Sequence, residues 1–383
     1  MASAAPAPAR HVHIEALQTA MPTRAVEPGR ARPVSVAAAA PLPAAALQRR
    51  SRVVLYYRAA AAADAPAAWS PEEALLVKES LSEAVADYPE MAGRLRRRGA
   101  DDGSGSSWEV KLNDTGVRLV LATVEAAVDD FVGAGVDEED RERWEAALAP
   151  WTHVDADDPD MCALCFVQLT RFKGDGGYAV GVSCSLMLCD PLSLARFLLS
   201  WARTHAAMKA QNKAAAIPVM QYAGYFQRPS TMTRRIKSVP LDAFATDAAV
   251  STETVLFRVA SGSGAARDDH RALARACVDE ASDRLGAAAK VTRLSLLVVA
   301  RDGVGDNPRG MSVETCTADS LPVPAGNKPE VAQWQDLGLQ EFALRESKPV
   351  HVSCSIVTAG DDEGLVVVMP DGKGFLVTVT VPK

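Results

Sequence analysis

The chain has 383 residues, of which 48% are hydrophobic and 23% are charged, and its formal net charge is −7. This length and composition are typical of a globular protein with a sizeable core, long enough for two domains. Lys and Arg residues are dispersed along the chain, which argues against nucleic acid as a partner. No run of about 18 uncharged apolar residues occurs, so we expect neither a transmembrane segment nor a secretory signal.

Seven cysteines form an odd set in apolar surroundings, which indicates a reducing compartment. Cys162 and Cys165 form a C-x-x-C pair, but no second pair of Cys or His follows at the spacing of a metal site. We interpret them as buried thiols and predict no metal site. The expected location is the cytoplasm.

The first half of the chain alternates predicted strands and helices. Residues 1–10 are low-complexity Ala and Pro, which we expect to be disordered. A helix is predicted at 70–88, where Ser70 and Pro71 form an N-terminal cap followed by an acidic first turn. A second helix is predicted at 191–209. Strands are predicted at 53–57, 108–112, 117–123, 164–172 and 178–185.

The second half repeats this alternation. Residues 206–250 show weak periodicity and are interpreted as a crossover between two domains. A helix is predicted at 270–288, and strands at 294–300, 350–357, 364–369 and 375–381. The sequence therefore predicts an α/β protein with an N-terminal domain at 1–205, a linker at 206–250 and a shortened C-terminal domain at 251–383.

Several segments resemble, in chain order, the plant BAHD acyl-CoA-dependent acyltransferase superfamily. In the first half these are YPEMAGRL at 88–95, NDTGV at 113–117, QLTRF at 168–172, GGYAVGV at 176–182 and FLLSWA at 197–202. In the second half they are VVAR at 298–301, Trp334, KPV at 348–350, and the Gly-Leu and Asp-Gly pairs at 364–365 and 371–372. The resemblance implies two similar chloramphenicol acetyltransferase-like domains of mixed sheet and helices, with an interdomain channel.

The catalytic motif of that family, H-x-x-x-D, has lost its histidine. Counting back four residues from Asp190 gives Leu186, preceded by Ser185, and no histidine occurs from 178 to 204. His205 lies fifteen residues beyond Asp190 on a predicted helix, which places it roughly 22 Å away. The resemblance therefore implies that the general base is absent.

The second family motif, DFGWG, is also lost. Alignment without gaps from Trp334 to Lys348 puts Ala343 to Ser347 on it without one identical residue. A rival register uses Asp336, Leu337 and Gly338, but it detaches the Lys-Pro-Val segment at 348–350, so we prefer the first. The interval from 311 to 333, which helps to bind coenzyme A in relatives, is shortened. Binding of coenzyme A or acyl-CoA is therefore in doubt, and we predict no cofactor.

Other positions of the family pattern are retained. The resemblance implies a structural ion pair between Asp190 and Arg301 at the domain interface, and Ser185, Leu186 and His351 are candidates to line the channel. His351 is the histidine whose sequence context places it near the interface, although a role as an ordinary strand residue is favoured.

The leading functional hypothesis is a non-catalytic accessory or binding protein, a pseudoenzyme, for an acyl or lipid ligand or a protein partner. The chain resembles the Eceriferum- and Glossy-type wax proteins, BAHD-like chains that assist the very-long-chain fatty-acid elongase without the acyl-transfer residues. This hypothesis places a monomer of plant lipid or wax metabolism in the cytoplasm, or at the periphery of the endoplasmic reticulum through a partner. The alternative is an acyl-CoA-dependent acyltransferase, or a lyase, with a non-standard catalytic residue.

Overall fold

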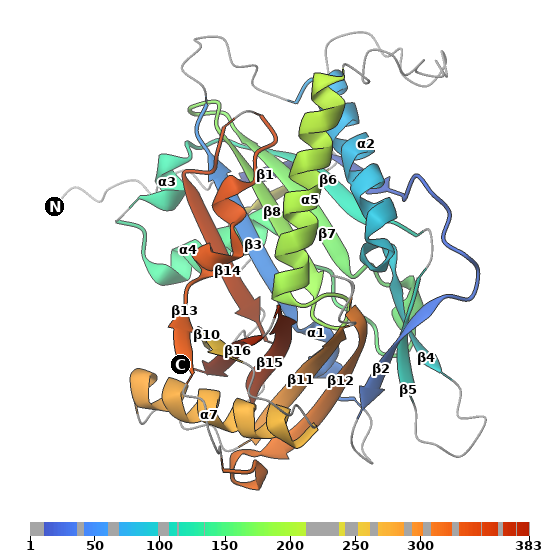
Figure 1. Cartoon of the computed structure of the whole chain (residues 1–383). Coiled ribbons are helices and arrows are strands. Elements are labelled where there is room, and N and C mark those ends of the chain that lie inside the picture. Colours follow the sequence, from blue (N-terminus) through green and yellow to red (C-terminus); the bar gives the residue numbers. More distant parts are fainter. Residues whose placement is uncertain are drawn as a thin grey trace, which may run out of the picture.

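The computed structural model (Figure 1) describes the elements between residue 11 and residue 382. The described ranges are 11–36, 42–59, 69–98, 107–112, 115–133, 135–211, 237–241, 252–260, 267–286, 293–301, 308–323, 329–345, 347–358, 363–372 and 374–382. The predicted disorder of residues 1–10 and most of the predicted crossover at 206–250 lie outside these ranges.

Two mixed β-sheets dominate the fold, as the sequence predicts. The first has seven strands in the order β14 (His351–Val357), β3 (Arg50–Tyr57), β8 (Tyr178–Ser185), β7 (Cys165–Phe172), β6 (Val117–Val124), β1 (His11–Ala20) and β9 (Lys237–Pro240). The second has nine strands in the order β13 (Glu330–Ala332), β10 (Thr252–Ala260), β16 (Gly374–Pro382), β15 (Gly364–Asp371), β11 (Arg293–Arg301), β12 (Pro308–Thr317), β2 (Ala31–Val36), β5 (Ser107–Lys111) and β4 (Arg94–Arg98).

Both sheets are mainly antiparallel and contain parallel pairs. β6 is parallel to β7 in the first sheet, and β11 is parallel to β15 in the second. Parallel neighbours need a crossover connection, and α3 (Asp129–Val132) with α4 (Glu138–Leu148) lies in the one between β6 and β7. The predicted α/β class is therefore confirmed.

Each sheet takes strands from both halves of the chain. β14 pairs with β3 in the first sheet, while β2 pairs with β12 in the second. β9, inside the predicted linker, pairs with β1, and the helix α5 (Pro191–Ala210) extends into the start of that linker. Strands from both sides of the predicted boundaries at 205 and 251 therefore pair within the same sheets. The division into two domains at these boundaries stays a prediction.

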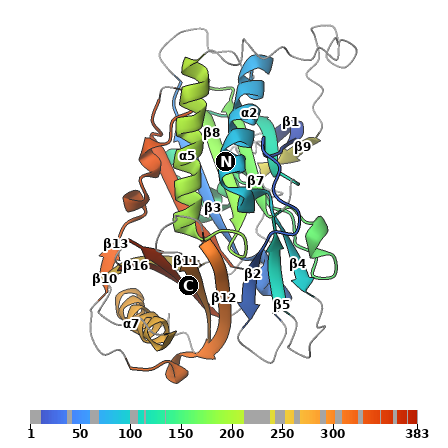
Figure 2. The same cartoon turned by 45° about the vertical axis from the view of Figure 1, so that its right-hand side comes forward.

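Helices cover both faces of the seven-stranded sheet (Figures 1 and 2). α2 (Pro71–Asp87) and α5 lie side by side on one face, and α3 and α4 lie on the other. α1 (Ala44–Gln48) precedes β3, and α7 (Arg267–Leu285) packs on the nine-stranded sheet. None of the helices in the described ranges is long and apolar enough to cross a membrane.

The predicted cap of α2 is present. The Ser70 hydroxyl accepts a hydrogen bond from the Glu73 amide at 3.2 Å, and the Glu73 carboxylate accepts one from the Ser70 amide at 3.2 Å. Pro71 follows at the first helical position. This reciprocal arrangement satisfies two backbone donors that would otherwise have no partner at the start of the helix.

Gly181 allows the end of α4 to approach the sheet. A β-carbon added at Gly181 would lie 2.0 Å from the carbonyl oxygen of Leu148, the last residue of α4. Glycine is therefore required at this position of β8 by close packing of two backbones, since no side chain fits there.

Candidate functional site

The segment where the sequence resemblance places the catalytic motif is a tight turn between β8 and α5. The amides of Leu188 and Cys189 donate to the Ser185 carbonyl at 2.9 and 3.0 Å, and the amide of Met187 donates to the Ser185 hydroxyl at 3.2 Å. The Leu186 amide donates to the Arg49 carbonyl at 3.0 Å. We call residues 185–190 the motif turn.

Leu186 lies in the largest hydrophobic core and is completely buried. That core also contains Val299 of β11 and Val367 of β15, so it takes side chains from both sheets. A leucine side chain can neither accept nor donate a proton, and solvent does not reach it here. An open channel to this position stays a prediction.

The hydroxyl and thiol groups near Leu186 are not activated as nucleophiles. The Ser183 hydroxyl donates to the Ala149 carbonyl at 2.7 Å, and that of Ser185 accepts the hydrogen bond within the turn. Hydrogen bonds to Cys165 and Cys189, and then burial, raise the pKa of Cys184 well above its ordinary value. A nucleophilic thiol needs a lowered pKa, so this cysteine is a buried structural residue.

Asp190 has two structural roles at the N-terminus of α5. Its carboxylate accepts hydrogen bonds from the Ser193 amide at 2.9 Å and from the Ser193 hydroxyl at 2.6 Å, which caps the helix. Arg301 Nη2 lies 3.0 Å from both carboxylate oxygens and 2.7 Å from the Ser193 hydroxyl. The structure thus brings the two expected ion-pair partners together, with their side chains 0% and 6% exposed.

Two further buried polar residues surround the motif turn, and the sequence did not indicate them. Arg32 of β2 donates to the carbonyl oxygens of Met187, at 3.0 Å, and of Leu188. Glu90 lies nearby, and burial raises its pKa, while the charge of Arg32 lowers it and that of Asp190 raises it. The carbonyl groups of the motif turn are therefore hydrogen-bonded by an arginine of β2, a strand of the other sheet.

His351 lies away from the motif turn. It pairs with Tyr56 across β14 and β3, and the two rings are 5.8 Å apart. Ser185 pairs with Arg50, six positions along β3 from Tyr56, so the separation along the strand is roughly 20 Å. Burial, and then the charge of Arg141, lower the pKa of His351. The structure does not bring His351 together with Ser185 and Leu186.

His153 is the histidine that sequence reasoning missed. Its Nε2 lies 3.4 Å from Nε2 of Gln48, and the Gln48 side chain forms two hydrogen bonds with the Val154 main chain, at 2.8 and 2.9 Å. An amide nitrogen only donates, so His153 Nε2 is the acceptor. Gln48 precedes Arg49, whose carbonyl accepts the Leu186 amide. Only this spatial link through Gln48 relates His153 to the motif turn.

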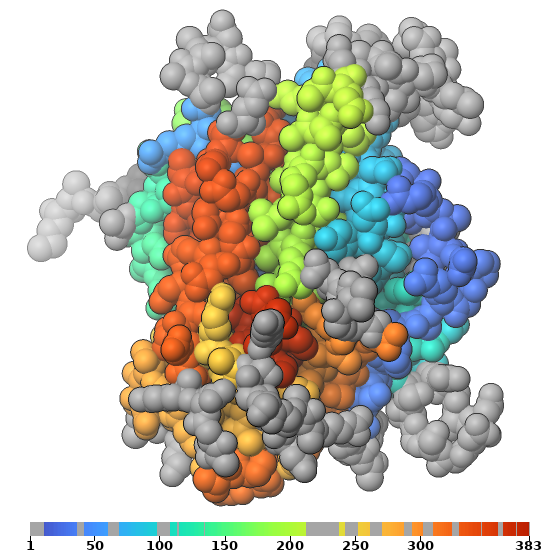
Figure 3. All heavy atoms as spheres, viewed as in Figure 1, coloured from blue at the N-terminus to red at the C-terminus, as the bar shows by residue number. Residues whose placement is uncertain are grey.

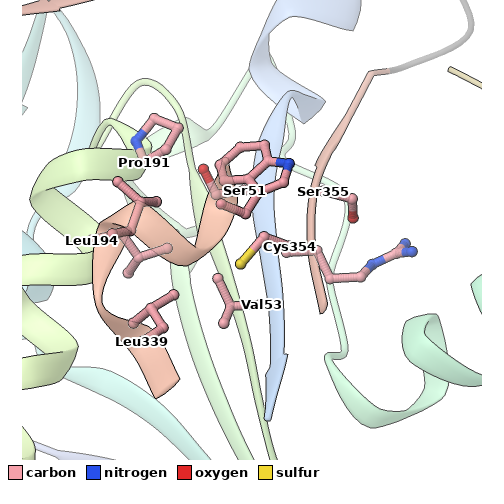
Figure 4. Close-up of a pocket in the computed structure, with 10 residues that line it drawn as sticks. Ser51, Val53, Pro191, Leu194, Leu339, Cys354 and Ser355 are labelled. Carbon is pink, nitrogen blue, oxygen red and sulfur yellow. The ribbon is translucent and has the colours of Figure 1, made fainter. Parts of the chain in front are cut away.

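A small cavity lies beside α5 (Figure 4). Its volume is about 10 Å³, room for about one water molecule. The lining residues come from β3, β14, the start of α5 and the 3₁₀ helices η6 (Trp334–Leu337) and η7 (Leu339–Glu341). Cys354 contributes a thiol, but burial, and then Glu145, raise its pKa to about 12. This cavity does not have the size or the activated group of a catalytic pocket.

The other candidate positions are structural. Cys165 is buried in β7, as expected, whereas Cys162 is only partly buried because it precedes the strand, and its sulfur accepts from the Asp155 amide at 3.2 Å. The described ranges contain no group of three His, Cys, Asp or Glu that could hold a metal. In the segment aligned with the second family motif, Leu344 is buried and Arg345 pairs with Glu73, while residue 346 lies outside the described ranges.

Comparison with known proteins gives the family. Rice (Oryza sativa subsp. japonica) agmatine hydroxycinnamoyltransferase 1 is 29% identical over 157 residues, 39% of this chain and 30% of that protein. Rice tryptamine benzoyltransferase 2 is 36% identical over 130 residues, 33% of this chain and 26% of that protein. The chain thus matches less than a third of the length of these relatives.

Among solved structures, vinorine synthase is 15% identical, with 97% of this chain and 95% of that chain covered and a TM-score of 0.47. A model described as the Transferase family matches residues 52–269, more than half of the chain. The chain therefore belongs to the Transferase family, the BAHD acyltransferase superfamily.

Proposed function

We propose that this protein is a non-catalytic BAHD member, an accessory or binding protein for an acyl or lipid ligand or for a protein partner. The observation that carries the proposal is Leu186, which stands at the general-base position and is completely buried. A general base contributes roughly 10²- to 10⁴-fold in rate, and leucine cannot replace it.

The surroundings of the turn support the same proposal. Cys184 has a raised pKa, and Ser185 is engaged in the turn, so neither is an activated nucleophile. Asp190 is held by Arg301 and by the cap of α5, the structural role that the family resemblance implies for it, so it does not replace the missing base. The residues that remain stabilise the fold, while those that would move a proton are gone.

In this proposal the protein acts in the cytoplasm or at the endoplasmic reticulum through a partner, in plant lipid or wax metabolism. The replacement of a histidine by Leu186 makes the region between the sheets more apolar, which suits an acyl chain better than a polar acceptor. Tight binding of coenzyme A is not expected.

The test combines activity and binding. Purified protein is incubated with acetyl-, malonyl-, benzoyl-, hydroxycinnamoyl- and long-chain acyl-CoA in the presence of alcohol and amine acceptors, and free thiol release is compared with a blank without acceptor. We expect no release above the blank. Native mass spectrometry with a C16 to C28 fatty-acid series as the probe is expected to show a one-to-one complex. Acceptor-dependent thiol release would overturn the non-catalytic proposal. Absence of any complex with a fatty acid would exclude the lipid ligand and leave a protein partner as the proposed binding function.

A second candidate function, acyl transfer with a non-standard base, is favoured by one observation. His153 lies against Gln48, next to the residue whose carbonyl holds the Leu186 amide, whereas His351 lies at the other end of β3. If transfer is detected, His153→Ala should abolish it and His351→Ala should not. Loss of turnover in His351→Ala alone would exclude His153 as the base.

A further inference from the structure

A cluster of cationic and aromatic side chains lies at the end of β7 remote from the motif turn. Arg171 pairs with Tyr178 across β7 and β8, six positions along β7 from Cys165, which is roughly 20 Å. The Tyr178 ring stacks on Tyr57 with centroids 4.3 Å apart. The Arg171 guanidinium lies 5.5 Å from the centre of the Trp69 ring, which also contacts the Tyr178 ring edge.

Arg171 is completely buried and lacks hydrogen-bond acceptors. Its Nε, Nη1 and Nη2 atoms are all inaccessible, and none of them has a hydrogen-bond partner in the described part of the chain. Within the same ranges, the buried Nε1 of Trp69 and Nε of Arg345 also have no acceptor. Buried polar groups are normally satisfied, so five donor atoms of this kind in one cluster indicate an acceptor that the described part of the chain does not supply.

Arg94 shows how this fold satisfies a buried arginine elsewhere. It is 1% exposed, and its Nη1 and Nη2 atoms donate to the carbonyls of Ala92, Gly93 and Gly116 at 2.9 to 3.3 Å. Arg171 has no corresponding carbonyls. Both guanidinium groups are buried and both have an Nε atom without an acceptor, so the difference between them is that Nη1 and Nη2 of Arg171 also have none.

The charge of the cluster is positive. Arg345 lies 4.6 Å from the centre of the Trp69 ring and pairs with Glu73, whose carboxylate also accepts the Ser70 amide. Two guanidinium groups thus face one carboxylate that is already engaged. Burial, and then the charge of Arg345, lower the pKa of Arg171, whereas Glu73 raises it. The contact of the Arg171 guanidinium with the Trp69 ring stabilises its positive charge less than a negatively charged partner would.

We propose that Arg171, Arg345 and Trp69 form a buried site for one small monovalent anion, either chloride or a small carboxylate. The anion supplies the acceptors that the guanidinium of Arg171 lacks and balances the excess charge. The Arg345 side chain is 25% exposed, so the cluster borders solvent on that side. This site is separate from the motif turn, and the inference does not depend on the proposed function.

The test measures stability against anion concentration. The intact protein is unfolded in urea at constant ionic strength while sodium gluconate, whose anion is much larger than chloride or formate, is replaced by sodium chloride or by sodium formate. One bound anion lost on unfolding decreases the unfolding constant tenfold for each tenfold rise in the anion above its dissociation constant. We expect this tenfold dependence of the unfolding constant for chloride, for formate or for both. The salt that shows the dependence identifies the anion.

The matched variants are Arg171→Gln and Arg94→Gln. Arg171→Gln should lose the dependence, while Arg94→Gln should retain it because Nη1 and Nη2 of Arg94 already donate to main-chain carbonyls. The ³⁵Cl NMR linewidth of the natural protein in chloride, with and without competing formate, gives a second measurement that does not require the variants to fold. Equal stability in all three salts together with unbroadened ³⁵Cl lines would overturn the proposal, as would an unchanged slope in Arg171→Gln.

Discussion

The ion pair between Asp190 and Arg301 provides the sharpest stability prediction. Both side chains are almost completely removed from solvent, so removal of one leaves the other as a buried charge. Such a change costs about 3 to 5 kcal/mol, a large part of the about 5 to 15 kcal/mol that stabilises a typical domain. We expect Asp190→Asn to fall in this range.

The variants separate the charge from the helix cap. Asparagine is a good N-cap residue, so Asp190→Asn keeps an acceptor for the Ser193 amide, and Asp190→Ala should cost about 1 kcal/mol more. Arg301→Met should cost less than Asp190→Asn, because Ser193 and the N-terminus of α5 still stabilise the carboxylate. The Asp190→Asn/Arg301→Met double variant should be about 2 to 3 kcal/mol more stable than the sum of the single variants implies.

The assay is equilibrium unfolding in urea, followed by the fluorescence of the six tryptophans. The matched control is the pair between Arg196, also on α5, and Asp371, in which Nη2 and Oδ1 are 3.1 Å apart but the side chains are 27% and 29% exposed. Its coupling should stay below about 1 kcal/mol. If the coupling free energy between Asp190 and Arg301 is no larger than that between Arg196 and Asp371, the reasoning that burial determines the strength of the ion pair is refuted.

Three further predictions follow from single positions. Leu186→His should restore no thiol release and should destabilise by about 1 to 3 kcal/mol, measured by urea unfolding, because an imidazole is placed in an apolar core. Burial lowers the pKa of His205 from 6.5 to about 4, so stability should be complete above about pH 6.5 and fall by about 3 kcal/mol as the pH decreases through 4, a loss that His205→Gln should reduce. Gly181→Ala should destabilise by about 3 kcal/mol or more, seen as a lower urea midpoint, because its β-carbon would overlap the Leu148 carbonyl.

Strong local patterns predicted their elements well. The Ser70 cap and the apolar spacing of 70–88 gave α2, and the apolar runs before and after the turn at 174–177 gave β7 and β8. These patterns depend on neighbours in the sequence, so one chain suffices to recognise them.

Elements that depend on distant partners were missed. β12 contains Gly310 and charged residues and lacks clean alternation, yet it forms a continuous ladder with β11 and pairs on its other side with β2. β9 reads as linker, and only its contact with β1 makes it a strand. In these segments, pairing with strands distant in the sequence overrides a weak local preference for strand structure. No local sequence pattern shows that a strand from one half of the chain joins a sheet formed by the other half.

The site was partly predictable for the same reason. The spacing of the family motif placed Leu186 and Asp190 on one turn, and the resemblance paired Asp190 with Arg301. His351 was expected near the interface from its sequence context after the Lys-Pro pair, and this stays a prediction. The direction of β14 along β3 places His351 next to Tyr56, away from Ser185. Arg32 could not be found, because only the pairing of β2 with the second sheet brings its guanidinium to the motif turn.

The two ends of the motif turn have different physical roles, and in our proposal this explains why one position can change without the other. Leucine at position 186 adds apolar surface to a core in which a buried imidazole would need a hydrogen-bond partner, so the replacement is compatible with stability. Asp190 caps α5, binds Ser193 and neutralises Arg301, and each of these contacts would be lost if the carboxylate were removed. In our proposal the chain can therefore lose its proton-transfer group and keep the fold. Loss of the Asp190 carboxylate, by contrast, would remove the ion pair that connects the start of α5 with Arg301 of β11.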